Sequence, residues 1–131
     1  MKKVTRQWLR KAESDVVVAR HLFKLKPLPT DEICFHCQQG IEKFFKSLLA
    51  ESGLPIQKTH DLTILLHQLI PGHPTLRALG RGLKATSRYA VEYRYPGMNT
   101  GGRQARAAFR KAVVVQNEIR RRLGLRAKPF K

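Results

Sequence analysis

Four polar residues recur at helical spacing within segment 33–49, namely His36, Gln39, Lys43 and Lys46. At 100° per residue they gather on one side of a helix. The two lysines supply positive charge, and the imidazole and amide groups can donate hydrogen bonds, so this side predicts a phosphate-binding surface. The alternative is a solvated face that only exchanges hydrogen bonds with neighbouring helices.

A second candidate is the pair His60-Asp61. An imidazole oriented by a carboxylate suits acid–base chemistry. We favour the structural interpretation, in which Asp61 or Thr59 caps a short helix and His60 is packed.

The third candidate is Arg94-Tyr95. The guanidinium group of arginine is a planar fork that matches phosphate, and a neighbouring tyrosine can stack on a base or offer its hydroxyl. Tyr95 packing over the end of the fold is the alternative.

No metal or cofactor site is expected. Cys34 and Cys37 lie three residues apart, but a tetrahedral zinc site needs a second pair of ligands at suitable spacing, and the histidines are scattered. Two cysteines in one helix predict reduced thiols in the core. The sequence also lacks a Gly-rich phosphate loop, a nucleophile elbow and a pair of catalytic carboxylates.

The elements that position these residues are predicted to be helices. Segment 33–49 also carries a broad apolar side, which indicates a central helix with several neighbours, and Gly40 within it indicates that another helix approaches closely. Thr5 is the expected cap of the first helix, and Thr30 or Asp31 that of the second. The expected helices cover about residues 5–25, 30–51, 61–69, 74–93 and 102–123. The predicted fold is all-α, an up-and-down, mostly antiparallel bundle of four long helices plus one short helix.

The chain of 131 residues suits a single domain, 1–131, with a frayed basic tail at about 124–131 that contains Arg126, Lys128 and Lys131. Its net charge of +17 is unevenly distributed along the chain. Residues 1–70 carry 11 basic and 7 acidic side chains, whereas residues 71–131 carry 15 basic and 2 acidic ones. Such a field attracts polyanions, although a merely solvated arginine-rich surface is the alternative. No long apolar run or signal peptide is evident, so we expect a cytoplasmic protein without a membrane span.

The order and spacing of several short motifs resemble the HEPN domain (higher eukaryotes and prokaryotes nucleotide-binding) over roughly residues 5–123. The motifs are Phe35-His36, Gln38-Gln39, Glu42-Lys43, Lys46, Leu48-Leu49, Thr59-His60-Asp61-Leu62 and Arg94-Tyr95-Pro96. The resemblance implies a helical bundle that commonly forms a homodimer, for which Val17, Val18 and Val114 are candidate contacts. It also implies a small nucleotidyltransferase partner in a two-component toxin–antitoxin module, and Tyr95 is a candidate acceptor of a nucleotidyl group from that partner.

Many HEPN proteins are metal-independent ribonucleases that use an arginine, four to six intervening residues and a histidine. None of the five histidines here has an arginine at that offset, so catalysis is not expected. We therefore predict a protein that binds a nucleotide or RNA phosphate and acts with a nucleotidyltransferase. The alternatives are a ribonuclease toxin that combines His60 with Arg94, and an adaptor whose basic rows at 77–88 and 103–121 bind RNA nonspecifically.

Overall fold

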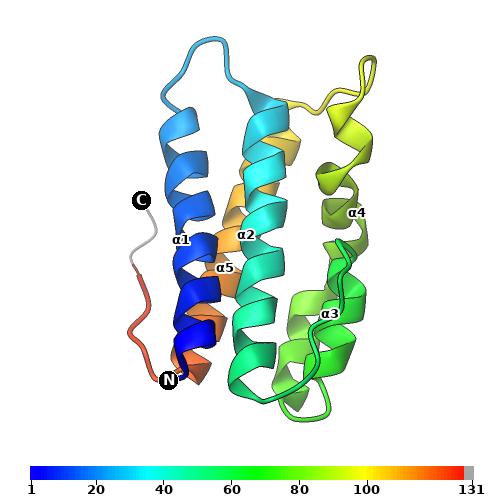
Figure 1. Cartoon of the computed structure of the whole chain (residues 1–131). Helices are drawn as coiled ribbons and strands as arrows, with labels where there is room; N and C mark the ends of the chain where they lie inside the picture. The colour runs from blue at the N-terminus through cyan, green and yellow to red at the C-terminus, as the bar shows by residue number, and fades with distance from the viewer. Residues whose placement is uncertain (129–131) are drawn as a thin grey trace.

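The predicted all-α fold is confirmed by the computed structural model, which describes residues 1–128 (Figure 1). The described residues contain no strand. Helix α1 runs antiparallel to α2 and to α5, and the remaining segments form a further rod beside α2. None of the helices within 1–128 is both long and apolar enough to cross a membrane. The elements are α1 (Lys3–Leu22), α2 (Thr30–Glu51), α3 (Leu62–Leu69), η1 (Pro74–Gly80), α4 (Leu83–Ser87), η2 (Arg88–Ala90), η3 (Glu92–Arg94) and α5 (Gly102–Arg122), where η marks a 3-10 helix.

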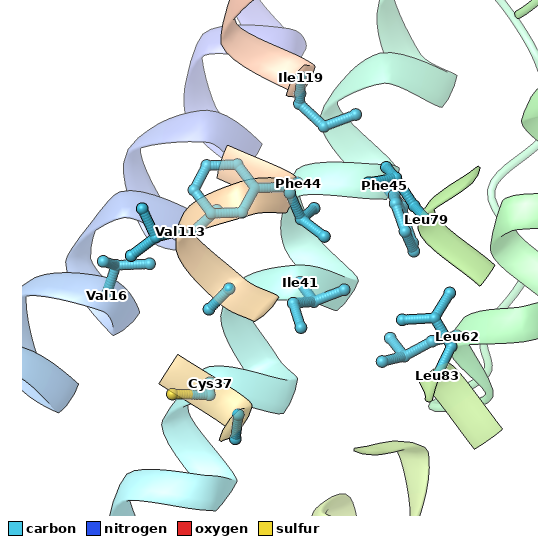
Figure 2. Packing of buried hydrophobic residues seen from close by; sticks show 14 of the residues in the cluster. Val16, Cys37, Ile41, Phe44, Phe45, Leu62, Leu79, Leu83, Val113 and Ile119 are labelled. Atoms are coloured by element: carbon cyan, nitrogen blue, oxygen red, sulfur yellow. The ribbon is translucent and has the colours of Figure 1, made fainter. Parts of the chain in front are cut away.

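Helix α2 is the centre of the core, as its broad apolar side predicts. Its Phe44 lies near Val16 of α1 and Val113 of α5, and its Phe45 lies near Leu79 of η1 (Figure 2). The apolar residues of α2 are buried, and both cysteines are among them: Ile33, Cys34, Cys37, Ile41, Phe44, Phe45, Leu48 and Leu49. One helix thus joins the two sides of the bundle.

Gly40 lies where α2 and α1 meet. A Cβ atom at this position would lie 3.5 Å from the carbonyl oxygen of Ala12 and 3.6 Å from Cγ2 of Val16. The close approach predicted from this glycine is therefore confirmed, and the remaining space matches a methyl group but nothing larger.

The predicted caps of the first two helices are wrong. Helix α1 begins two residues before Thr5, whose hydroxyl instead donates to Glu51 at 2.8 Å. Helix α2 begins at Thr30 without a side-chain cap, because Thr30 and Asp31 bond to Thr100 in the loop just before α5. These side chains form hydrogen bonds with distant segments and are therefore not used to cap their own helices.

The expected long helix over residues 74–93 is broken into η1, α4, η2 and η3. Gly82 has a φ of +79°, a left-handed conformation that ends one segment and starts the next. Leu76, Leu79 and Leu83, spaced along this stretch, are nevertheless buried. The segments together therefore fill the position expected for the fourth long helix.

The basic tail is attached to the bundle as far as Lys128, contrary to the frayed end we predicted. Gly124 follows α5 with a φ of +79°, which agrees with the predicted helix end at residue 123. Beyond it, the amide N–H of Lys128 donates to Asn117 at 2.9 Å and its ammonium group pairs with Glu13. Lys131 lies outside the described residues.

The three valines considered as dimer contacts are all exposed. Val17 and Val18 lie on α1, and Val114 lies on α5. The homodimer itself stays a prediction.

Substitutions at Gly40 measure how tightly α1 and α2 approach. We expect Gly40→Ala to raise the free energy of unfolding by up to about 1 kcal/mol, because alanine favours the helix and its methyl group fits. We expect Gly40→Leu to lower it by about 1–3 kcal/mol by overpacking. Urea unfolding of both variants checks this, and a Gly40→Leu variant as stable as the wild type would contradict the close contact.

Candidate functional site

Two buried carboxylates organise the polar side of α2, and the first belongs to Asp15 of α1. Oδ1 of Asp15 lies 2.9 Å from Nδ1 of His36, and its Oδ2 lies 2.7 Å from Nζ of Lys43. The side chain of Asp15 is only 11% exposed. The charge of Lys43 is thus balanced inside the protein by the neighbouring helix.

The second carboxylate belongs to Glu42 of α2 itself. Its Oε2 accepts from Nζ of Lys46 at 2.8 Å, and its Oε1 lies 2.9 Å from Nδ1 of His60 and accepts from Nε2 of Gln38 at 3.2 Å. The same Gln38 amide donates to the main-chain carbonyl of His60 at 3.1 Å. We call Glu42, Lys46, His60 and Gln38 the Glu42 cluster.

Glu42 stays ionised in this surrounding. Burial alone would raise its pKa, but the hydrogen bonds from Lys46, His60 and Gln38 and the charge of Lys46 together lower it below the ordinary value for glutamate. Lys46 is buried too, and its ammonium group lies 5.4 Å from the centre of the Trp8 ring. Lys46 therefore lies in an ion pair beneath the surface.

Gln39 and Asp61 have local roles next to this cluster. The Gln39 amide donates to Oε1 of Gln38 at 2.7 Å and so helps to orient it. Asp61 caps α3, as the structural interpretation expected, because its Oδ1 accepts from the main-chain N–H of Thr63 at 3.0 Å. The packed His60 that we predicted is wrong, because its imidazole is 59% exposed. The carboxylate that orients His60 is that of Glu42, and the other ring nitrogen stays accessible.

Arg94 lies over an aromatic ring of α2. Its Cζ is 4.2 Å from the centre of the Phe35 ring, which in turn meets the His36 ring edge to face at 5.5 Å. No carboxylate within residues 1–128 forms an ion pair with Arg94, and the side chain is exposed. Its planar fork is therefore available to a ligand.

An open hollow of about 510 Å³ adjoins Arg94. Two tyrosines and two carboxylates of the N-terminal end of α2 contribute to its walls, and Tyr95 is 64% exposed there. Tyr95 is therefore not packed over the end of the fold, which was the alternative interpretation. The lining residues are Asp31, Glu32, Tyr93, Arg94, Tyr95, Pro96, Met98 and Asn99.

The two cysteines are core thiols. Burial raises the pKa of Cys34 to about 11 and also raises that of Cys37, so both stay protonated. In the part of the chain that the structure describes, no three or more His, Cys, Asp and Glu side chains gather as metal ligands.

The structure therefore joins most of the predicted site residues through two carboxylates, Asp15 and Glu42, that we did not predict as site residues. His36 and Lys43 meet at Asp15, and Lys46 and His60 meet at Glu42. The spacing of Glu42 and Lys46, four residues apart in a helix, was a usable signal for their ion pair. Asp15 had no such signal, because its partners lie on another helix.

The Glu42–Lys46 pair can be tested by stability. At pH 7 we expect Glu42→Gln to lower the free energy of unfolding by about 3 kcal/mol, because it leaves a buried ammonium group without its carboxylate. A glutamate with a lowered folded pKa stabilises the fold above its unfolded pKa of about 4.3, and this contribution is lost as the pH falls through the folded value. The difference between variant and wild type should therefore shrink in acid.

A double-mutant cycle is the control. The double variant Glu42→Gln/Lys46→Met should be more stable than the sum of the two single changes predicts, as measured by urea unfolding at pH 7. Strictly additive single effects would show that the pair does not interact.

Comparison with known proteins places the chain in a family. The family model described as HEPN domain matches residues 5–122, almost the whole chain. Searches of curated proteins and of solved structures each returned no significant match. Because the family match covers far more than half of the sequence and agrees with its all-α bundle, this chain belongs to the HEPN domain family.

Proposed function

We propose that this HEPN protein binds a nucleotide, free or as part of RNA, beside Arg94 on the polar side of α2, and that it acts with a nucleotidyltransferase partner in a two-component module. The observation that carries the proposal is the state of Arg94. It is exposed, stacked on Phe35 at 4.2 Å and without an ion pair among residues 1–128. An arginine held over a ring in this way offers two N–H groups to one phosphate at low cost in side-chain entropy.

The charge balance favours Arg94 over the two lysines as the phosphate contact. Lys43 and Lys46 each pair with a buried carboxylate, so neither contributes a free charge to the surface. His36 touches the same aromatic ring as Arg94, and His60 lies at Glu42, seven residues further along α2. Seven residues of helix span about 10.5 Å, so Arg94 and His60 are suited to successive groups of one extended ligand.

The hollow beside Arg94 suits the nucleoside part. Tyr93 and Tyr95 offer aromatic surface for a base. The carboxylates of Asp31 and Glu32 repel phosphate but can accept hydrogen bonds from sugar hydroxyl or base amino groups. This asymmetry sets an orientation, with the phosphate at Arg94 and the nucleoside toward the acidic wall.

Replacing Arg94 tests the proposal. We expect Arg94→Ala to weaken ATP binding by about 10- to 100-fold, the loss of one or two charge-assisted hydrogen bonds, and Arg94→Lys to restore only part of it. Titration calorimetry with ATP measures both. Arg10→Ala, which removes an exposed arginine on α1, is the matched control and should bind as the wild type does.

Equal affinity of the wild type and Arg94→Ala for ATP would contradict this site. RNA incubated with the wild type should stay intact under the same conditions. Cleavage of that RNA, lost on His60→Ala, would instead favour the ribonuclease alternative, for which the contact between His60 and Glu42 is the supporting observation.

The exposure of Tyr95 supports the second half of the proposal. A hydroxyl that accepts a nucleotidyl group has to reach the active site of another protein, and Tyr95 is 64% exposed next to Arg94. In the transfer, the tyrosine oxygen attacks the α-phosphorus of ATP, the bond to pyrophosphate breaks and the hydroxyl proton leaves to solvent. Arg94 can stabilise the charge on the transferred phosphate.

Mass spectrometry tests the transfer. After incubation with the proposed nucleotidyltransferase partner and with ATP, we expect the wild type to gain the mass of one AMP group and Tyr95→Phe to gain none. Tyr93→Phe, altered in the same hollow, is the control and should be modified as the wild type is. An unchanged mass of the wild type would contradict the role of Tyr95.

A further inference from the structure

The two basic rows of the C-terminal half lie side by side in the fold. Thr75 at the start of η1 accepts a hydrogen bond from Arg122, and Ala78 lines a shallow hollow together with Val114 of α5. About one helical turn further along each segment, the charge of Arg81 helps to lower the pKa of Lys111. The segment after Pro74 therefore follows α5 in the opposite direction and adds its cations to those of that helix.

We define the α5 basic face as Arg81, Arg103, Arg106, Arg110 and Lys111. On α5, residues 103, 106 and 110 recur at i, i+3 and i+7 and so share one side of the helix, opposite its buried residues. All four arginines are exposed, and Lys111 is half-buried.

No carboxylate compensates this face. Between residues 62 and 117 the only acidic residue is Glu92, and it pairs with Arg88 at 2.8 Å. None of the five cations forms an ion pair among residues 1–128. Burial and then the charge of Arg81 lower the pKa of Lys111, so the two cations disfavour each other in the isolated protein. A bound polyanion would relieve that repulsion.

We propose that the α5 basic face binds the sugar–phosphate backbone of a nucleic acid. Four of its five cations are arginines, whose fork geometry matches phosphate. From residue 103 to residue 110 the row is about 10.5 Å long, and nucleotides follow one another at about 3.4 Å along a helical strand, so the row spans roughly three of them. Protein partners instead bury aromatic and apolar anchors, and the only large apolar side chain exposed on α5 within the described residues is Val114.

This face is separate from the nucleotide site beside Arg94. Helix α5 lies behind α2 in Figure 1, and its outer row is opposite the side that packs on α2. On α2, Phe35 and Glu42 lie about 180° and 160° around the helix from Phe44, which lies near Val113 of α5 (Figure 2). The two surfaces therefore lie on opposite sides of the bundle and can be altered independently.

Binding of a labelled single-stranded RNA, measured by fluorescence anisotropy over a range of salt concentrations, tests this proposal. For the variant Arg81→Gln/Arg110→Gln we expect affinity to fall about tenfold or more at 100 mM salt. The slope of log K against log salt should become shallower by about 1.4, because each lost phosphate contact on a single strand contributes about 0.7. Both side chains are exposed, so the urea midpoint of the variant should match that of the wild type.

The matched control is Arg10→Gln/Lys11→Gln on α1, which removes the same charge from another face and should leave affinity and slope nearly unchanged. Equal losses in both double variants would mean a general charge effect and would overturn the proposal. So would failure of the wild type to bind RNA and DNA while it binds poly-glutamate, because the partner would then be an acidic protein.

Two further measurements identify the ligand and separate the sites. Binding of a DNA strand of the same sequence shows whether the face distinguishes RNA from DNA. Salt-dependent binding of either strand supports the proposal. For Arg94→Ala, the slope of log K for RNA against log salt should equal that of the wild type even if the variant loses ATP binding. A shallower slope in that variant would overturn the separation of the two surfaces.

Discussion

The ionised carboxylate of Glu42, enclosed in the bundle, is the interaction on which the arrangement of the polar side of α2 depends. Withdrawing a charge from water is costly, and the cost is met only when several groups hydrogen-bond to it at good geometry. Here those groups come from α2 itself, through Lys46 and Gln38, and from the connection before α3, through His60. Because the main-chain carbonyl of His60 is held as well, the carboxylate fixes the path of that connection and the orientation of the imidazole together.

Asp15 repeats this arrangement from α1, and the repetition determines how charge is distributed over the whole protein. Most acidic residues of the N-terminal half accept internal hydrogen bonds, as Asp15, Asp31, Glu42, Glu51 and Asp61 do. Their carboxylates hold lysines and histidines by hydrogen bonds or join segments. The C-terminal half has only two acidic residues after position 70, so the excess positive charge remains on its surface. This distribution agrees with the nucleotide or RNA association that the HEPN family implies.

Local patterns predicted the elements well where only the chain's own periodicity mattered. The core residues of α2, the close approach at Gly40, the cap at Asp61 and the end of α5 at Gly124 all followed from spacing or from backbone preference. The failures share one cause. Thr5 and Thr30 do not cap helices because Glu51 and Thr100 attract their hydroxyl groups, and segment 74–93 breaks at Gly82 although its leucines keep their inward positions.

The sequence by itself determined the all-α bundle, its central helix, the surplus of positive charge and the residue types available for phosphate, because helical periodicity and composition are local properties of the chain. Only the tertiary structure decided which of those groups are free. It paired Lys43 with Asp15, placed Lys46 beneath the surface, and left Arg94 exposed on Phe35. It also brought Arg81 close enough to Lys111 for its charge to lower the pKa of that lysine. Contacts between helices depend on how the helices rotate and approach one another in space, and no spacing along one segment carries that information.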